Sequence, residues 1–234
     1  MKNNLICVQS GGQYSQQYVM NLYKGARAFS QHNFDFYVFT DNIKQHPQDL
    51  GWKFIPLPNW SWLNGFNPWW YKLEIFNPQH NIQGNNLYVD LDVVICNDID
   101  PFWKFINGNF CILQDFNRAF NPRIGYCNSS IMGWQNNTAQ DLYFKFAESM
   151  QEQIKAHRGD QDFIQTELKK KTIWPVEWAM SWKWEVKHGG KKHPYKEYKM
   201  PKVPYILSPH TKIIVCHGKP NPHEIPELSH IWNK

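Results

Sequence analysis

Two aspartates stand inside the most apolar segment of the chain. Asp90 and Asp92 lie within residues 87–95, whose other members are Leu, Tyr, Val and Ile. Buried carboxylates are costly unless they are paired or bind a metal. Residues two apart share a face of a strand, so at a strand end both carboxylates can converge on one hard cation. The pattern indicates an Mg²⁺ or Mn²⁺ site, with capping or surface contacts at a strand end as the alternative.

A second segment with candidate ligand-binding residues follows the apolar run at 213–216. It consists of His217, Gly218 and Lys219 in succession. Imidazole is a ligand for metals, glycine lets the backbone approach a ligand, and an ammonium is a point charge for phosphate. These are the parts that a complex of a diphosphate with a metal needs, and the alternative is an ordinary exposed loop.

Polar residues in two expected helices complete the candidate chemistry. Asp160, Gln161 and Asp162 open a helix, where they place two carboxylates and an amide near a polar ligand. The alternative is structural, with Asp160 as N-cap and Asp162 as a partner of the helix dipole. Lys72 lies in an apolar helix at 69–76, where its stem can also simply snorkel.

Alternating strand and helix patterns carry these residues. Strands are expected at 5–9, 34–39, 53–57, 86–95, 109–113, 128–134 and 213–216, and helices at about 13–30, 69–76, 138–150 and 160–171. Such alternation predicts a single α/β domain with a sheet covered by helices. Residues 172–212, rich in Trp, Lys and Pro, are expected to be irregular, and a polar, Pro-rich tail is expected after 217.

Length and composition limit the class of protein. The 234 residues suit one large domain, and 42% hydrophobic with 19% charged residues is typical of a globular chain. No apolar run approaches the ~20 residues that a transmembrane helix needs. The first residues do not fit a signal peptide, so we expect a cytoplasmic protein.

The cysteines and the charges add two weaker indications. The cysteines are odd in number, five, and contain no Cys-x-x-Cys, which favours buried reduced thiols in a reducing compartment. Residues 1–150 carry ten basic and eleven acidic side chains, whereas residues 151–234 carry fifteen and nine. The basic second part suits an anionic ligand, and a solvated lysine face explains it equally.

These segments, in their order along the chain, resemble those of the nucleotide-sugar glycosyltransferases of the GT-A fold. Family 8, the group of glycogenin and the bacterial lipopolysaccharide galactosyltransferases, is the most similar. The resemblance extends over about residues 5–220, with a poor match in 172–212. It implies one Rossmann-like domain over 1–234 with a mostly parallel central sheet. Residues 1–100 would form the nucleotide-binding half, and residues 101–234 the acceptor-binding half.

The resemblance implies a donor site that depends on Mn²⁺ or Mg²⁺. The Tyr-Val-Asp-Leu-Asp run is similar to the family's Asp-x-Asp motif, in which Asp90 contacts the ribose and the metal, and Asp92 holds the metal and the diphosphate. The run that starts at His217 is similar to the family's His-x-x-Gly-x-x-Lys-Pro, but it lacks the spacer residues. It implies that His217 is a metal ligand, and that Gly218 and Lys219 belong to the donor site, with Lys219 on a phosphate.

Two further segments match the family's contacts to the donor sugar. Asn128 and Ser129 belong to a run similar to the family's Asn-Ser-Gly on the strand beside the sugar. The run at 160–162 is similar to its Asp-Gln-Asp. By this resemblance, Asp160 binds sugar hydroxyls and Gln161 lies under the anomeric carbon.

Lys72 and Tyr14 complete the implied donor site. Lys72 matches the lysine of Thr-Lys-Leu in glycogenin-like members, where it approaches the sugar, although Tyr71 replaces the threonine. The loop at 10–14 takes the place of the first nucleotide-binding loop, and Tyr14 can stack on the base. The Asp or Asn usual in that loop is replaced by Gly-Gly-Gln, which leaves the base open, and we expect UDP.

The implied reaction moves a sugar from a nucleoside diphosphate to an acceptor hydroxyl. The resemblance to family 8 implies retention. Because Gln161 is not a strong nucleophile, the acceptor hydroxyl is then expected to attack from the leaving-group side, with a phosphate oxygen as base. An inverting enzyme instead needs a carboxylate base, for which Asp162 is the candidate. The motifs leave the stereochemistry open.

Aromatic clusters are the candidates for the acceptor site. Tryptophan gathers in two short stretches: Trp60, Trp62, Trp69 and Trp70 in the first, and Trp174, Trp178, Trp182 and Trp184, with Lys183 and Lys187, in the second. Aromatic faces bind sugar rings or bases, and cations bind phosphate, whereas the alternative is a core and a lid of large side chains. A glycan is the first candidate acceptor, a nucleic acid such as a modified DNA base the second, and a membrane glycolipid the third.

Other classes of protein stay open. A metal-dependent nucleotidyltransferase or a sugar-nucleotide hydrolase also uses paired aspartates, and a binding module without activity fits the same fold. Nucleotidyltransferases of similar topology have a basic, Gly-rich first loop, and residues 10–14 contain no Lys or Arg. The joint presence of Asp90, Asp92, His217 and Lys219 favours an enzyme over a binding module.

Overall fold

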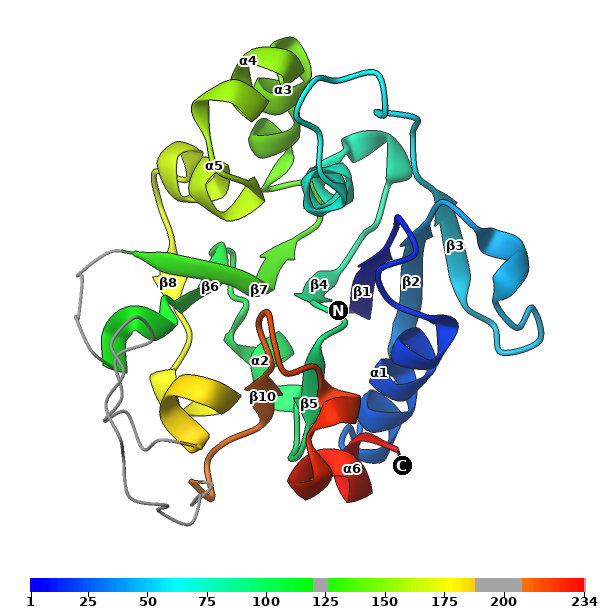
Figure 1. Ribbon diagram of the computed structural model, residues 1–234, viewed down its shortest axis with the longest axis vertical. Coiled ribbons are helices and arrows are strands. Elements are labelled where there is room, and N and C mark those ends of the chain that lie inside the picture. Colours follow the sequence, from blue (N-terminus) through cyan, green and yellow to red (C-terminus); the bar gives the residue numbers. More distant parts are fainter. Residues whose placement is uncertain (120–125, 188–207, 234) are drawn as a thin grey trace.

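A seven-stranded sheet forms the centre of the structure (Figure 1). The computed structural model describes residues 1–119, 126–187 and 208–233. The strand order is β3-β2-β1-β4-β7-β6-β8, formed by β1 (Asn3–Gln9), β2 (Asp35–Thr40), β3 (Lys53–Pro56), β4 (Asn85–Val89), β6 (Cys111–Gln114), β7 (Cys127–Gln135) and β8 (Thr172–Ile173). Four strand pairs are parallel, while β7 is antiparallel to both β4 and β6. The expected α/β fold with a mostly parallel central sheet is confirmed.

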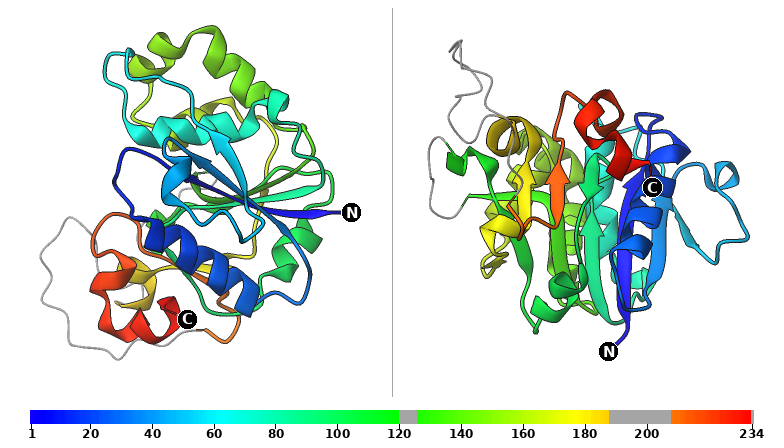
Figure 2. Two further views of the ribbon diagram at one scale, coloured as in Figure 1. Left: turned by 90° about the vertical axis from the view of Figure 1, so that its right-hand side faces the viewer. Right: turned by 90° about the horizontal axis from the view of Figure 1, so that it is seen from below.

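Helices cover both faces of this sheet (Figure 2). One face carries α1 (Gln16–Ala28), α2 (Asp100–Phe105) and α6 (Pro226–Trp232), and the other carries a 3-10 helix (Pro68–Phe76), α3 (Gln140–Glu148), α4 (Met150–Ala156) and α5 (Asp160–Glu167). Successive residues of β1 point to opposite faces, so Leu5 and Cys7 join one hydrophobic cluster and Ile6 joins the other. Because both faces of β1 are covered, its central residues 5–8 form a continuous apolar run.

A smaller sheet with the order β5-β10-β9 brings two candidate segments together. It consists of β5 (Val93–Ile95), β10 (Ile213–Val215) and β9 (Ala179–Ser181). Val93 pairs with Val215, and the backbone N–H of Cys216 donates to the carbonyl of Asp92 at 2.8 Å. The loop that begins at His217 therefore starts beside the aspartate pair.

The strand expected at 86–95 is two strands in the structure, which corrects the prediction. β4 ends at Val89, and β5 begins at Val93 in the other sheet. The N–H of Asp90 still donates to the carbonyl of Ser130 at 2.9 Å, whereas the carbonyl of Asp92 accepts from the β10 side. The aspartates occupy the crossing between the sheets, because their carboxylates do not fit between two apolar layers.

Three predicted helices differ in their bounds or type. The helix expected at 138–150 ends at Glu148, and α4 follows after a break at Ser149. The helix expected at 160–171 ends at Glu167, because the chain must become extended to pair β8 with β6. The segment at 69–76 is a 3-10 helix that begins at Pro68.

The second part of the chain has more regular structure than expected. Strands β8 and β9 and a π-helical turn (Trp182–Val186) lie in the segment predicted to be irregular, whose residues 188–207 are outside the described part. The predicted polar tail contains α6, because Leu228 and Trp232, four residues apart, pack on the core. The Trp232 ring lies 5.0 Å from the ring of Tyr18 in α1.

Two predictions about the whole chain can be compared with the structure. All five cysteines are free, four of them buried and Cys96 half-buried, as expected for reduced thiols. Among the helices of residues 1–119, 126–187 and 208–233, none has the length and the apolar character needed to cross a bilayer.

Candidate active site

Two adjoining cavities open at the carboxyl ends of β1 and β4. The first has a volume of about 560 Å³ and the second about 350 Å³. They share Trp69, Lys72 and Asp90. In open α/β sheets, ligands bind at this edge.

Each of the predicted site residues lines at least one of these cavities. The first is lined by Tyr14, Lys72, Asp90, Asp92, Gly218 and Lys219. The second is lined by Lys72, Asp90, Asn128, Ser129, Asp160, Gln161, Asp162 and His217. Segments that are far apart in the sequence therefore meet at one edge of the sheet.

The aspartate pair is held by two tyrosines. The hydroxyl of Tyr88 donates to Asp90 at 2.5 Å, and that of Tyr14 donates to Asp92 at 3.2 Å. Burial, together with the negative charge of Asp90, raises the pKa of Asp92 to about 6. A cation bound beside Asp92 would therefore stabilise the ionised form of its carboxylate.

Lys72 connects the aspartate pair to the start of α5. Its ammonium lies 2.9 Å from Asp160 and 3.1 Å from Asp90, and it donates to the hydroxyl of Ser129 at 3.1 Å. Burial disfavours the charged form, but Asp160 and Asp90 outweigh it and hold the pKa of Lys72 above its usual value. The lysine does not snorkel to solvent; it is 8% exposed and forms the centre of a buried ion-pair network.

The start of α5 differs from the structural alternative. Gly159 occupies the N-cap position, and its helix has no side-chain cap. Asp160 instead accepts from the hydroxyl of Ser129 at 2.8 Å and pairs with Lys72, so the N-cap interpretation is wrong. The half-buried carboxylate of Asp162 faces the second cavity and forms no hydrogen bond or ion pair with the described residues.

Gln161 is fixed by three partners. Its side-chain oxygen accepts from the amide of Asn128 at 2.9 Å and from the N–H of Ser129 at 3.3 Å. Its own amide donates to Asp115 at 3.3 Å. Sequence reasoning missed Asp115, although a carboxylate directly after the apolar strand β6 repeats the signal that identified Asp90.

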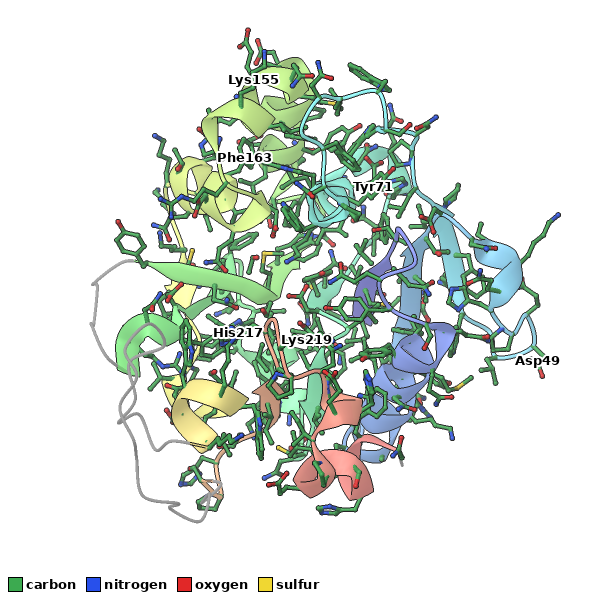
Figure 3. The ribbon with its side chains drawn as sticks, in the orientation of Figure 1. Asp49, Tyr71, Lys155, Phe163, His217 and Lys219 are labelled. Carbon is green, nitrogen blue, oxygen red and sulfur yellow. The ribbon has the colours of Figure 1, made fainter. Side chains whose placement is uncertain are left out.

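His217 lies on the loop after β10 (Figure 3). Two aromatic rings contact its imidazole. Its ring stacks on Phe116 at 5.3 Å, meets Trp184 edge-on at 4.6 Å, and its Nε2 contacts the hydroxyl of Ser181 at 2.8 Å. Burial, with a smaller effect of the charge on Lys183, lowers the pKa of His217 to about 3. The imidazole is therefore neutral at physiological pH.

The next residues of this loop are exposed. Gly218 has φ of +70°, a conformation that side chains disfavour. The ammonium of Lys219 lies 3.3 Å from Glu224, with 72% of the lysine side chain exposed. Exposed pairs of this kind contribute little, so Lys219 can exchange Glu224 for another anion.

The first loop is held by a residue that sequence reasoning missed. The N–H of Gly11 donates to the carboxylate of Asp41 at 2.8 Å. Asp41 directly follows β2, so a strand-end carboxylate again carried the signal. Asp41 lines neither cavity, so its contact fixes the backbone of the loop.

The tryptophans divide between core and surface. Trp60, Trp70, Trp174 and Trp182 are buried, Trp178 and Trp184 are half-buried, and Trp62 and Trp69 are 67% and 46% exposed. The core interpretation therefore holds for most of both stretches. Trp69 is the exception, because it is exposed and lines both cavities.

The donor set fits a hard divalent cation at Asp90 and Asp92. Carboxylate oxygens are ligands that suit Mg²⁺ or Mn²⁺. A bound cation would also lower the raised pKa of Asp92. Among the described residues, no three His, Cys, Asp or Glu side chains are grouped closely enough to hold a metal by themselves. Further ligands would have to come from water or from a bound anion, and His217 does not join the pair in this arrangement.

The architecture is that of the GT-A glycosyltransferases. Among solved structures, the chain is similar to the galactosyltransferase LgtC in complex with donor and acceptor sugar analogues, with a TM-score of 0.60 and 13% identity over 94% of this chain and 88% of LgtC. It is also similar to the glycosyltransferase GlyE of Streptococcus pneumoniae TIGR4, with a TM-score of 0.68 and 14% identity over 99% of this chain and 60% of GlyE. No protein-family profile and no curated protein matches the sequence. At such identities the likeness concerns the fold, and it agrees with the resemblance drawn from the motifs.

Proposed function

We propose that the protein is a glycosyltransferase that uses a nucleoside-diphosphate sugar, preferably a UDP-sugar, together with Mn²⁺ or Mg²⁺. The observation that carries the proposal is the pair of cavities that share Lys72 and Asp90. The first, of about 560 Å³, has the size of a nucleotide site, and the second, of about 350 Å³, has the size of a sugar site. The shared residues lie where the bond between diphosphate and sugar would be.

The residues around the first cavity suit a nucleoside diphosphate. Asp90 and Asp92 would hold the cation, which when bound would neutralise charge on the departing diphosphate. Lys219, held only by an exposed pair with Glu224, can turn to a phosphate. Tyr14 presents its ring to the same cavity, where a base can stack.

The residues around the second cavity suit a sugar. Asp160, Asn128 and Ser129 offer hydrogen-bond groups there, and their mutual contacts keep them in place. Gln161 is an amide whose oxygen is already engaged by two N–H donors, so it is not a nucleophile. We propose retention on the motif resemblance, and without a nucleophile at Gln161 the acceptor would attack from the leaving-group side. Asp162 is the base if the enzyme inverts, and the anomeric configuration of the product, determined by NMR, decides between the two.

Thermal melting with a panel of nucleoside diphosphates tests the donor site. We expect UDP to raise the melting temperature in the presence of Mn²⁺ and to do so less in EDTA. A ligand at about 100 times its Kd stabilises a protein by about 2.7 kcal/mol, which is easily measured. The other nucleoside diphosphates and uridine serve as controls. Absence of a shift with every nucleotide, with and without Mn²⁺, would contradict the proposed function.

We further propose that the acceptor is a glycan or the glycan of a glycolipid, and that Trp69 stacks on it. Stacking of a nucleobase on an aromatic side chain contributes about 1–3 kcal/mol. For the C–H face of a sugar ring on Trp69 we expect the lower part of this range, so Trp69→Ala should raise the KM for the acceptor about tenfold. The Kd for UDP should change much less. Phe144→Ala, which removes a 50% exposed ring that lines neither cavity, is the matched control. An unchanged acceptor KM in the Trp69 variant would exclude this role.

A further inference from the structure

A lysine of the π-helical turn lies next to the aspartate pair. Lys183 follows β9 by two residues and is half-buried, with its ammonium 5.7 Å from the ring centre of Trp184. It forms no hydrogen bond or ion pair with any residue of the described part of the chain. A partly buried ammonium without an anionic partner is costly, so its position favours the binding of an anion.

The ammonium of Lys183 packs against the loop that lines the first cavity. A Cβ atom at Gly218 would lie 3.2 Å from Nζ of Lys183, so the absence of a side chain at Gly218 keeps this side of the loop open. Gly218 itself lines the first cavity, together with Asp92 and Lys219. The ammonium of Lys183 is thus separated from the proposed diphosphate site by the backbone of Gly218.

The charges around Lys183 support the same location. Burial lowers its pKa, while Asp92 and Cys216 act in the opposite direction. The positive charge in turn contributes to the lowered pKa of His217. The ammonium of Lys183 is thus close enough to Asp92 and His217 for their charges to interact, and an anion bound beside Gly218 would meet the same positive charge.

The other lysines near the cavity have carboxylate partners. Lys72 is paired with Asp90 and Asp160, and Lys219 is paired with Glu224. Lys183 is the lysine whose charge no described carboxylate compensates in an ion pair. A lysine ammonium is a compact charge that suits phosphate oxygens.

We propose that Lys183 is a diphosphate-binding residue of the donor site and contacts the nucleoside diphosphate across Gly218. This proposal rests on the proposed function, since it assigns one more contact to the same ligand. Lys183 acts through its own charge, so its contribution does not pass through the cation at Asp90 and Asp92. Part of the affinity for the diphosphate therefore persists in EDTA.

Isothermal titration of UDP tests this contact in the wild type, Lys183→Met and Lys183→Arg. Methionine has a side chain of similar length without the charge, and it should weaken UDP binding about ten- to a hundredfold, both with Mn²⁺ and in EDTA. Arginine should restore most of the affinity. Lys155→Met, at an exposed lysine of α4 far from the loop of His217 (Figure 3), should bind UDP like the wild type.

Each outcome has a defined meaning. Wild-type affinity in Lys183→Met overturns the contact and leaves the proposed function intact. A loss seen only with Mn²⁺, or an equal loss for uridine, also overturns it, because the effect would then pass through the cation or through the fold. If the wild type binds no nucleoside diphosphate of the panel, the proposed function fails, and this contact fails with it. A melting curve of each unliganded variant verifies folding, and Lys183→Gln replaces the methionine variant if that one is unfolded.

Discussion

Lys72→Met should lower the free energy of unfolding by about 3–5 kcal/mol, the usual cost of removing one partner from a buried ion-pair network. The substitution leaves the carboxylates of Asp90 and Asp160 without their common cation, 3.1 Å and 2.9 Å from where the ammonium stood. It also leaves the hydroxyl of Ser129 without its donor. Urea denaturation followed by circular dichroism measures the loss.

Lys145→Met is the matched control for this experiment. Lys145 pairs with Glu167 at 2.6 Å, but 43% of its side chain is exposed. Such a surface pair contributes about 0–1 kcal/mol, so the control should be close to the wild type. A loss in Lys72→Met as small as in the control would mean that the ion-pair network does not stabilise the fold, and that the hydrogen bonds from Tyr88 and Ser129 suffice to hold Asp90 and Asp160.

Asp92→Asn should separate activity from stability. We expect sugar transfer to fall by at least about 10²–10³-fold, because the variant removes one of the two carboxylates that would hold the cation opposite the diphosphate. Without a divalent cation, the variant should be at least as stable as the wild type. The reason is that burial and the charge of Asp90 already raise the pKa of Asp92 to about 6, so the neutral amide suits this position better. Turnover and melting temperature are measured on the same preparation.

Asp49→Asn removes the same charge at an exposed site far from the cavities (Figure 3). It should change neither activity nor melting temperature. Mn²⁺ should raise the melting temperature of the wild type and of this control, but not that of Asp92→Asn. Unchanged turnover in Asp92→Asn would refute the assignment of the cation to the aspartate pair.

Much of the sheet was predictable because its strands are buried on both faces. Continuous apolar runs such as the one around Ile6 identify such strands without any knowledge of their neighbours. The same property hid the break between β4 and β5, since Val89 and Val93 are equally apolar on both sides of it. The break depends on which strand supplies the hydrogen-bond partner, and Cys216, which supplies it, is 124 residues after Asp92.

The sequence allowed us to predict which residues form the candidate site. It did not allow us to predict the hydrogen bonds and ion pairs between them. Residue type and position at a strand end identified Asp90, and the same signal was present but unused at Asp41 and Asp115. The network around Lys72 could not be foreseen, since a lysine in an apolar helix is equally compatible with a stem that reaches solvent. The position of Lys183 depends on β9 joining β10, which no local pattern in residues 172–187 revealed.

The amino-acid sequence by itself determined the α/β class, most strands, the helix α1 and the chemical groups available for a reaction. These depend on interactions between residues a few positions apart, which periodicity and residue type record directly. Only the tertiary structure decided the order of the strands, the crossing at Asp90–Asp92, the pairing of Lys72 with Asp160 and the burial of His217 between aromatic rings. Those features arise from contacts between distant segments, whose free energies depend on burial and on the distance between charges, and neither quantity exists before the chain has folded.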